Sequence, residues 1–270
     1  MSLQSIAVIV RSCGREILLN RTMESIASQT LLPAEIILVG LGQKGRAAAE
    51  AFRSRSGVKV LEVPEKRIRG GALNDGVEAS YSRWITFLDD DDTWNPHFLS
   101  EMARTAMSHQ SPSFGALVCR TEVVYEKVDS DGIKEQGREQ FNPWLRIVNS
   151  DLLYYRNRFT INAAFWSRDV VVNMGGFSEE LGAMEDWEFN RRASRAYEIR
   201  VLPRVLARYH RRPANDLLPN SLLREHDKVA WCLQREWLKE TSFFGPTWHR
   251  RNVARGWAAL KRLRVRMNRI

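Results

Sequence analysis

The run Trp84-Ile85-Thr86-Phe87-Leu88 is followed directly by four aspartates, Asp89-Asp90-Asp91-Asp92. The apolar run predicts a buried strand, and a buried strand cannot enclose four carboxylates, so these must emerge where the chain leaves the sheet. There they form a dense negative site whose repulsion a cation relieves. On this stretch alone, the alternative is a solvated turn in which Asp92 caps the next helix, because Asp is common at helix N-caps.

The residues around the aspartates alternate between strand and helix patterns. Short apolar runs predict strands at residues 6–10, 35–39, 58–63 and 83–88. Helical spacing or composition predicts helices near residues 18–26, 44–55 and 72–81. Such alternation indicates an α/β fold with a Rossmann-like, mainly parallel sheet flanked by helices. Ligands of these sheets bind at the carboxyl ends of the strands, where the aspartates lie.

The second half of the chain is less regular. Its patterns predict helices at 96–109 and 185–196, and strands at 115–128, 159–166 and 204–209. Asp129-Ser130-Asp131-Gly132 predicts a turn, and Gly175-Gly176-Phe177 predicts a tight loop. Residues 133–158 show no readable pattern.

Composition limits the class of protein. The chain has 270 residues, of which 44% are hydrophobic and 27% charged, as expected for a globular protein with a real core. No apolar run approaches the roughly 20 residues of a membrane-spanning helix, and no signal peptide precedes the first predicted strand. The three cysteines are odd in number and far apart, which argues against a disulfide framework or zinc site. We therefore expect a cytoplasmic protein.

The net charge of +9 comes from the end of the chain. Residues 248–270 hold eight Lys/Arg and no Asp/Glu, and the rest carries 33 basic and 32 acidic residues. This near-neutral body argues against nucleic-acid binding. Within the tail, apolar residues recur at helical spacing, which predicts a basic amphipathic helix. Such a helix suits the inner face of an anionic membrane; alternatively, it packs on the domain or on a second subunit in a homodimer.

Two further groups of residues carry chemistry. Glu185-Asp186 opens a predicted helix, where carboxylates gain from the helix dipole and where an Asp can also serve as a general base. Tyr209-His210-Arg211-Arg212 follows a predicted strand. Histidine is a common metal ligand and arginine binds phosphate in a bidentate manner, although such a run is often a surface loop.

In this order, the motifs resemble the family 2 glycosyltransferases of the GT-A type. The resemblance covers most of residues 5–212 and rests on Ile6-Ala7-Val8-Ile9-Val10-Arg11-Ser12-Cys13-Gly14-Arg15, Ser28-Gln29-Thr30, Glu35-Ile36-Ile37-Leu38-Val39, Gly71-Ala72-Leu73-Asn74-Asp75-Gly76, Phe87-Leu88-Asp89-Asp90-Asp91-Asp92-Thr93-Trp94, Gly175-Gly176-Phe177-Ser178-Glu179-Glu180-Leu181, Glu185-Asp186-Trp187-Glu188-Phe189 and Tyr209-His210-Arg211.

The resemblance implies a GT-A catalytic domain at residues 1–212. Its nucleotide-sugar-binding half spans about 1–110 and its acceptor-binding half about 111–212, and a C-terminal helical extension follows at 213–270. It further implies a hexosyltransferase-like enzyme that inverts the sugar as it moves from a nucleotide-diphosphate sugar to a hydroxyl of a glycan or lipid-linked acceptor. The cofactor implied is Mn²⁺ or Mg²⁺, and the expected setting is the synthesis of a surface polysaccharide or glycolipid.

The resemblance also assigns roles to single residues. Asp186 corresponds to the catalytic base, with Glu185 beside it. Asp89 and Asp91 form the Asp-x-Asp motif, with Asp91 the best direct metal ligand and His210 a further one. The residues expected to bind the nucleotide sugar are Ser12, Arg69, Asn74, Asp89, Asp90 and Arg211.

One departure from the family pattern leaves other functions open. Many members end the second strand with an Asp that binds the nucleobase, whereas this chain reads Val39-Gly40-Leu41-Gly42. The choice of nucleotide is therefore open. A metal-dependent nucleotidyltransferase also uses paired aspartates on an α/β sheet, but it does not account for Glu185-Asp186. An inactive family member that acts as a binding protein is the other alternative.

Overall fold

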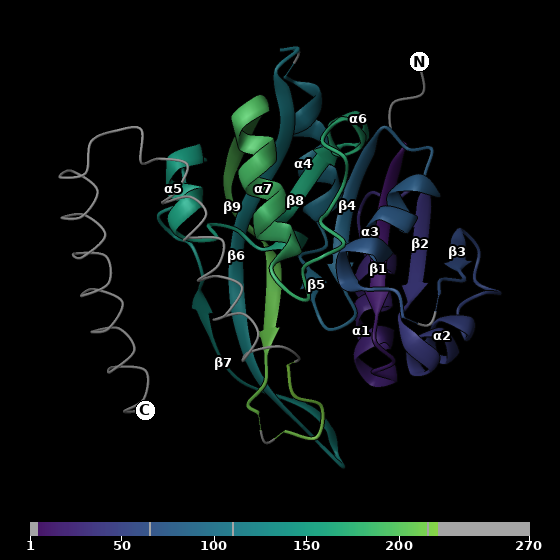
Figure 1. The fold of residues 1–270 in the computed structure, drawn as a ribbon. Coiled ribbons are helices and arrows are strands. Elements are labelled where there is room, and N and C mark those ends of the chain that lie inside the picture. Colours follow the sequence, from purple (N-terminus) through teal and green to yellow (C-terminus); the bar gives the residue numbers. More distant parts are fainter. Residues whose placement is uncertain (1–4, 65, 110, 215, 221–270) are drawn as a thin grey trace. The chain divides into compact units, whose positions relative to one another are not determined.

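The computed structural model describes residues 5–64, 66–109, 111–214 and 216–220 (Figure 1). The chain divides into two units, Met1–Val229 and Ala230–Ile270, and all the described residues lie in the first. The predicted basic helix at 248–270 lies outside the described residues. Among the residues that are described, no helix is long and apolar enough to span a membrane.

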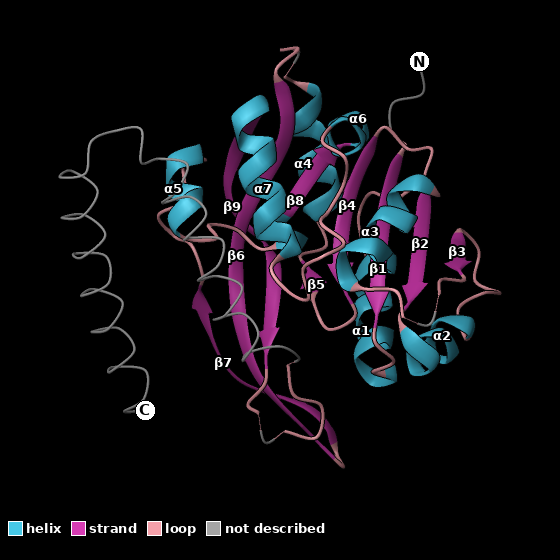
Figure 2. Ribbon diagram, viewed as in Figure 1, coloured by secondary structure: helices cyan, strands magenta, loops and turns pink. Residues whose placement is uncertain are grey.

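The described residues form one mixed sheet of nine strands (Figure 2). The strands are β1 Ile6–Ser12, β2 Glu35–Gly40, β3 Val58–Leu61, β4 Trp84–Asp89, β5 Thr93–Trp94, β6 Phe114–Asp129, β7 Gly132–Gln140, β8 Ala164–Ser167 and β9 Glu198–Arg211. Their order is β3-β2-β1-β4-β8-β6-β9-β5, with β7 paired to β6. The first four strands are parallel, as predicted, and β8 runs antiparallel to β4 and β6.

Helices cover both faces of this sheet. They are α1 Glu16–Ala27, α2 Gly42–Glu50, α3 Arg69–Glu78, α4 Phe98–Met107, α5 Ser150–Tyr155, α6 Arg168–Asn173 and α7 Glu185–Ala196. The bounds of α7 are those predicted. The strand predicted at 159–166 is wrong in its first half, because Ile161–Ala163 form a 3₁₀ turn (η1). The buried amide of Asn162 binds the Arg208 carbonyl from this turn, which favours a bent backbone over a strand.

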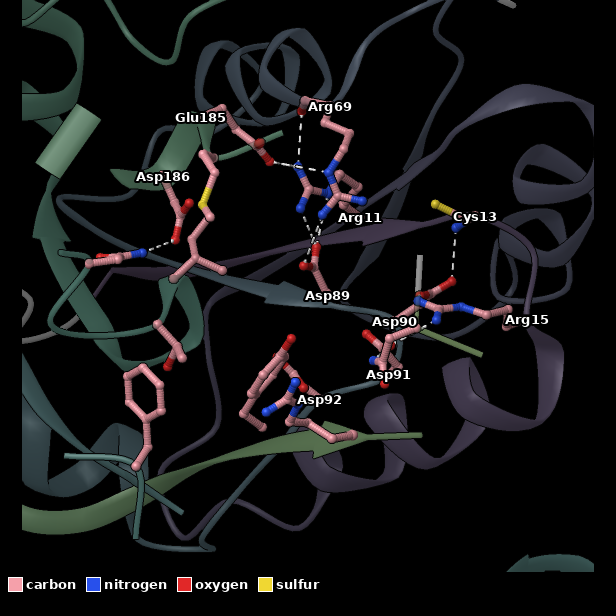
Figure 3. Close-up of a pocket in the computed structure, with 18 residues that line it drawn as sticks. Arg11, Cys13, Arg15, Arg69, Asp89, Asp90, Asp91, Asp92, Glu185 and Asp186 are labelled. Atoms are coloured by element: carbon pink, nitrogen blue, oxygen red, sulfur yellow. Dashed lines mark hydrogen bonds and ion pairs between the residues drawn. The ribbon is translucent and has the colours of Figure 1, made fainter. Parts of the chain in front are cut away.

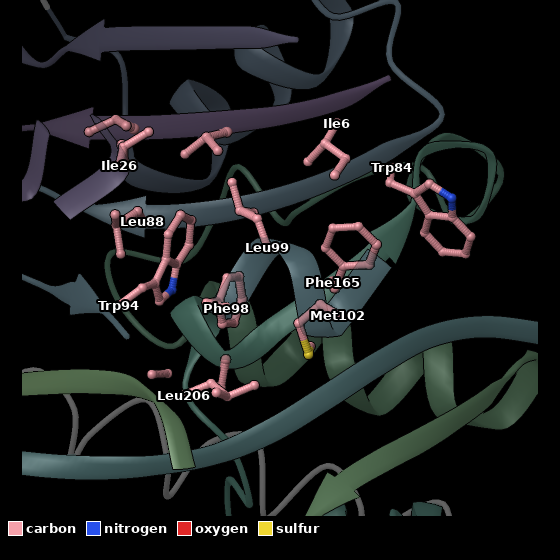
Figure 4. Packing of buried hydrophobic residues seen from close by; sticks show 14 of the residues in the cluster. Ile6, Ile26, Trp84, Leu88, Trp94, Phe98, Leu99, Met102, Phe165 and Leu206 are labelled. Atoms are coloured by element: carbon pink, nitrogen blue, oxygen red, sulfur yellow. The ribbon is translucent and has the colours of Figure 1, made fainter. Parts of the chain in front are cut away.

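The core consists of two apolar layers, one on each face of the sheet. Alternate residues of β1 point to opposite sides: Val8 joins α1, α2 and α4 in one layer, and Ile9 joins α3, α6 and α7 in the other. The rings of Trp94 and Phe98 stack at 4.3 Å between centroids in the first layer (Figure 4). Because both faces are covered, the carboxyl ends of β1 and β4 are the parts of the central strands that can present polar groups.

The aspartate run leaves the sheet at the end of β4, as predicted, but Asp92 does not cap a helix. Asp92 is 2% exposed and accepts hydrogen bonds from the His210 amide and the Asn162 side chain, both at 3.0 Å. These contacts tie the turn to β9 and to η1. The N-terminal amide of Leu99 in α4 is satisfied instead by the side-chain oxygen of Gln29, at 3.0 Å.

Candidate active site

A cavity of about 310 Å³ lies at the carboxyl ends of β1 and β4 (Figure 3). The N-terminal ends of α3 and α7 and the end of β9 contribute to the same cavity. Its described lining comprises Arg11, Cys13, Arg15, Arg69, Asp89, Asp90, Asp91, Asp92, Phe141, Asn157, Thr160, Ile161, Met184, Glu185, Asp186, Tyr209, Arg211 and Asn220. The structure therefore brings the aspartate run, the Glu185-Asp186 pair and Arg69 together, as the sequence predicts.

Asp89 is held by two arginines. Its Oδ1 lies 2.6 Å from Nη2 of Arg11, and its Oδ2 lies 3.3 Å from Nη2 of Arg69. Burial alone would raise the pKa of Asp89, but the charges of Arg11 and Arg69 outweigh it and lower that pKa. Asp89 is consequently ionised, and both of its oxygens are engaged.

Asp90 supports the loop that follows β1. Its Oδ2 accepts hydrogen bonds from the Ser12 hydroxyl at 2.9 Å and from the Cys13 amide at 2.8 Å, and its Oδ1 pairs with Arg15. The side chain is 1% exposed. Burial raises the pKa of Asp90, and the neighbouring charge of Asp91 adds to the effect, while Arg15 opposes it. The predicted solvated turn is thus wrong, because buried partners replace solvent.

Asp91 directs one oxygen to protein partners. Its Oδ2 lies 2.7 Å from Nη1 of Arg15 and 3.2 Å from Nδ2 of Asn220, and it also pairs with Arg212. Among the described contacts, none involves Oδ1. Because Asp91 lines the cavity, this oxygen is the carboxylate atom of the run that remains available to a ligand.

A strained residue precedes the second acidic group. Met184 has φ 63°, and it is the one non-glycine residue at positive φ in the described part of the chain. Strain of this kind persists where a site requires it, and here it turns the chain so that α7 begins at Glu185. Glu185 is 3% exposed and lies 2.5 Å from Arg11.

Asp186 has the character of a general base. Its Oδ2 accepts a hydrogen bond from Nδ2 of Asn157 at 3.0 Å. Burial raises the pKa of Asp186 to about 6, with a further contribution from the charge of Glu185. A carboxylate with this pKa is mostly ionised at pH 7 and accepts a proton more readily than an ordinary Asp.

Three predicted site residues, Ser12, Asn74 and His210, are not among the described residues that line the cavity. Ser12 is buried beneath it and binds Asp90. Asn74 was expected to bind the nucleotide, but its amide instead exchanges two hydrogen bonds with the backbone of Phe177, at 2.8 and 2.9 Å. It therefore fixes the Gly175-Gly176-Phe177 loop.

His210, expected as a metal ligand, is also absent from the cavity lining. Burial lowers its pKa, so the imidazole is neutral near pH 7. Its Nδ1 lies 2.7 Å from Glu126, and its Nε2 lies 2.8 Å from the Thr93 hydroxyl. A neutral ring that donates through Nδ1 must accept through Nε2, which leaves no lone pair for a metal.

Glu126 of β6 organises the floor beneath the aspartates. It contacts His210, Arg21 at 2.6 Å and Arg212 at 2.5 Å. Burial would raise the pKa of Glu126, but the hydrogen bonds from His210 and Arg21 outweigh it and hold the pKa at about 2. The ionised Glu126 therefore orients Arg212, which in turn contacts Asp91.

The cavity offers a partial donor set for a divalent cation. No cluster of three His, Cys, Asp or Glu side chains that could hold a metal occurs among the described residues. Mg²⁺ and Mn²⁺ nevertheless often use one or two carboxylates together with substrate phosphates. Oδ1 of Asp91 fits that role. Asp89 could serve only if it released an arginine, because both of its oxygens are engaged.

The arginines of the cavity were missed in the sequence, with the exception of Arg69 and Arg211. Arg11 and Asp89 are partners in the register between β1 and β4, although 78 residues separate them. Sequence spacing gives no sign of such a pair. The signal that could have found Arg11 is a charged residue inside an otherwise apolar strand, since buried charges are paired. Arg15 carries no comparable signal.

Comparisons with known proteins identify the family of this chain. The family model described as "Glycosyl transferase family 2" matches residues 7–178. YwdF of Bacillus subtilis, an uncharacterized glycosyltransferase, is 21% identical over 202 residues, which cover 73% of this chain and 71% of YwdF. The O-antigen biosynthesis protein RfbC of Myxococcus xanthus is 24% identical over 189 residues, or 67% of this chain and 14% of RfbC.

Solved structures share the fold. S. aureus TarS 1-349 in complex with UDP-GlcNAc superposes with a TM-score of 0.60 at 19% identity, covering 79% of this chain and 60% of TarS 1-349. This chain therefore spans less than two thirds of that structure. The mixed sheet with its flanking helices is a GT-A-like fold, as predicted. Together with the family match over residues 7–178, these findings show that the chain belongs to glycosyl transferase family 2.

Proposed function

We propose that this glycosyltransferase moves a sugar from a nucleotide-diphosphate sugar to an acceptor hydroxyl, with inversion at the anomeric carbon. The observation that carries the proposal is Asp186, a carboxylate with a pKa of about 6 that faces the same cavity as the arginines and Asp91. An inverting displacement needs a base and a leaving-group site on opposite sides of the sugar. Asp186, Asp91, Arg69 and Arg211 line one cavity, which supports the proposal.

The transfer begins at the acceptor. Asp186 takes the proton of the acceptor hydroxyl as its oxygen forms a bond to the anomeric carbon. The bond from that carbon to the diphosphate oxygen breaks, and the electron pair leaves with the nucleoside diphosphate. A proton thus passes to Asp186 and negative charge passes to the diphosphate. Asn157 orients the carboxylate of Asp186 for this step.

The donor diphosphate lies, in this proposal, beside Arg69 and Arg211, which both line the cavity. Arginine is suited to phosphate because its planar fork donates two parallel hydrogen bonds. A Mn²⁺ or Mg²⁺ ion bound by Asp91 would neutralise charge on the leaving group. The pair between Arg69 and Asp89 is loose, at 3.3 Å, so Arg69 can turn from Asp89 to the diphosphate.

The acceptor and the biological setting complete the proposal. The segment from Phe141 to Ile161 contributes residues to the cavity, so we assign the glycan or lipid-linked acceptor to this segment. The name of RfbC supports a role in the synthesis of a surface polysaccharide. The basic tail at 248–270 suits attachment of a cytoplasmic enzyme to the inner face of a membrane.

A donor screen tests the proposal. Thermal unfolding is measured with UDP-, GDP-, dTDP- and CMP-sugars, with and without Mn²⁺, and the donor that stabilises the protein is then tested for release of its nucleotide. We expect one nucleotide class to raise the unfolding temperature and to be consumed, with an inverted anomeric centre in the product. Stabilisation without any turnover would indicate a binding protein, and a retained configuration would contradict direct displacement.

A further inference from the structure

Arg11 is a buried link between the donor end of the cavity and the helix that carries Asp186. It is 2% exposed and stands at the end of β1, where strand pairing places it beside Asp89. Its Nη2 lies 2.6 Å from Asp89 Oδ1, and its Nη1 lies 2.5 Å from Glu185 Oε1. One guanidinium therefore joins two carboxylates from different halves of the site (Figure 3).

Arg69 forms a second and looser bridge between the same two carboxylates. Its Nη2 lies 3.3 Å from Asp89, and its Nε lies 3.3 Å from Glu185. Arg69 is also 23% exposed at its side chain, whereas Arg11 is almost fully enclosed. A bound diphosphate can therefore attract Arg69 away from its carboxylates while the Arg11 bridge persists.

We propose that Arg11 and Glu185 are positioning residues for the transfer: their ion pair anchors the first turn of α7 to the donor end of the site and so places Asp186 against the bound sugar. This inference rests on the assignment of Asp186 as the base. It changes the role expected for Glu185, which acts through Asp186 and Arg11 and does not itself receive a proton from the acceptor. Arg11 gains a role that its sequence position does not suggest.

The charge of Glu185 also acts on its neighbour. Across the cavity, Asp186 shares the lining with Arg69 of α3, Asp89 of β4 and Arg211 of β9. Helix α7 also packs on α5, but α5 contributes no charged group to the described lining of the cavity. Removing the negative charge of Glu185 must therefore make Asp186 easier to ionise.

The other groups that affect the pKa of Asp186 do not reverse this effect of Glu185. Burial raises its pKa most and the charge of Glu185 raises it further, while the Trp187 amide, Asn157 and Arg11 lower it. Replacing Glu185 by a neutral residue also leaves the positive charge of Arg11 less compensated. Both changes lower the pKa of Asp186.

Glu185→Gln is the direct test, because it keeps the shape of the side chain and removes its charge. The acid limb of the pH profile of kcat/KM, measured with the donor selected by the screen, should move to lower pH by about one unit. The matched control is Glu188→Gln, in the same helical turn, where Glu188 pairs with Arg192 at 2.5 Å. The control profile should coincide with that of the unmodified protein.

Arg11→Lys separates position from charge. Lysine keeps the positive charge but lacks the fork that spans two carboxylates. We expect kcat to fall about tenfold to a hundredfold, with the acid limb left in place. Unchanged kcat in this variant, or identical pH profiles for Glu185→Gln and Glu188→Gln, would overturn the proposal.

The proposed function can fail separately from this inference. Turnover by Asp186→Asn at the rate of the unmodified protein would show that Asp186 is not the base. If Asp186→Asn is inactive while Glu185→Gln keeps an unshifted profile, the base assignment stands and the positioning role of Arg11 and Glu185 is rejected. Thermal unfolding of each variant, compared with the unmodified protein, confirms that the kinetic effects occur in folded enzyme.

Discussion

At the scale of single residues, Asp186 is a buried carboxylate for which we propose the role of a base. A base must be ionised before it can accept a proton. Its pKa of about 6 in the folded protein exceeds the value of about 3.9 expected when unfolded, so folding favours the protonated form. The contribution of this pKa shift to the free energy of unfolding is therefore complete below the unfolded pKa. It is lost as the pH rises through about 6. At neutral pH the buried, ionised carboxylate therefore lowers the stability of the folded protein, and this loss accompanies its proposed role as a base.

This cost predicts that Asp186→Asn is more stable than the unmodified protein. At pH 8 the gain in the free energy of unfolding should be about 1–2 kcal/mol, after allowance for partial solvent screening. The gain should be much smaller near pH 4, where the carboxyl is neutral in the folded protein and only about half ionised in the unfolded chain. Denaturant unfolding at the two pH values checks this, with the exposed Asp131→Asn as the control. An equal gain at both pH values would show that the charge of Asp186 is not responsible.

Asp91 allows a second prediction at this scale. Asp91→Asn should lose the Mn²⁺-dependent part of nucleotide affinity, because the carboxylate available to the cation is gone. It should keep its affinity, or gain some, in metal-free buffer, because Arg15, which also lines the cavity, is freed from its ion pair with Asp91 and can bind the diphosphate. Calorimetric titration with and without Mn²⁺ distinguishes these effects. A normal Mn²⁺ dependence in the variant would exclude Asp91 as a ligand.

Among the site residues, those that end a strand or open a helix could be predicted from the sequence. Asp89 and Asp186 hold such positions, and local patterns place them at one edge of the sheet. The partners of Arg11 could not be predicted, because they depend on the register of β1 with β4 and on the approach of α7. Asn74 and His210 lie near the edge but point to structural partners, which sequence position does not reveal.

At the scale of elements, the apolar strands were readable in the sequence and the polar strand β7 was not. β4 is a continuous apolar run, whereas β7 is polar along most of its length because its one partner is β6 and most of its side chains are at least partly exposed. The hydrophobic pattern of β7 therefore carries no strand signal. α5 has six residues, too few to show helical periodicity.

The loop before α7 provides a prediction at this scale. Gly176 has φ 70°, and a Cβ there would lie 2.4 Å from the Asn74 side-chain oxygen. Gly175 has φ 76° but no atom within 4 Å of such a Cβ. Both alanine variants bear backbone strain, so Gly175→Ala is the matched control for the contact with Asn74.

We expect Gly175→Ala to lose about 1 kcal/mol of stability and Gly176→Ala to lose about 2–3 kcal/mol, since only the latter disrupts a partly buried hydrogen-bonded contact. The difference is measured by denaturant unfolding. Equal losses in the two variants would mean that Asn74 does not hold this loop.

At the scale of the whole molecule, nearly all of the net positive charge lies in the tail. Residues 248–270 carry eight of the 41 basic residues and lie outside the described residues. The unmodified protein should float with anionic vesicles and lose this property when residues 248–270 are removed, because polybasic segments are drawn to anionic lipid. Neutral vesicles and high salt are the controls. Equal flotation of the full and shortened chains would reject a membrane role for the tail.

The proposed transfer depends most on Asp186 as the base that activates the acceptor. The direct measurement compares unmodified protein with Asp186→Asn, using single-turnover release of nucleotide from the selected donor together with the dissociation constant of that nucleotide. The base assignment predicts at least about a hundredfold loss of turnover with nucleotide affinity preserved. Turnover at the unmodified rate, with affinity also preserved, would contradict it.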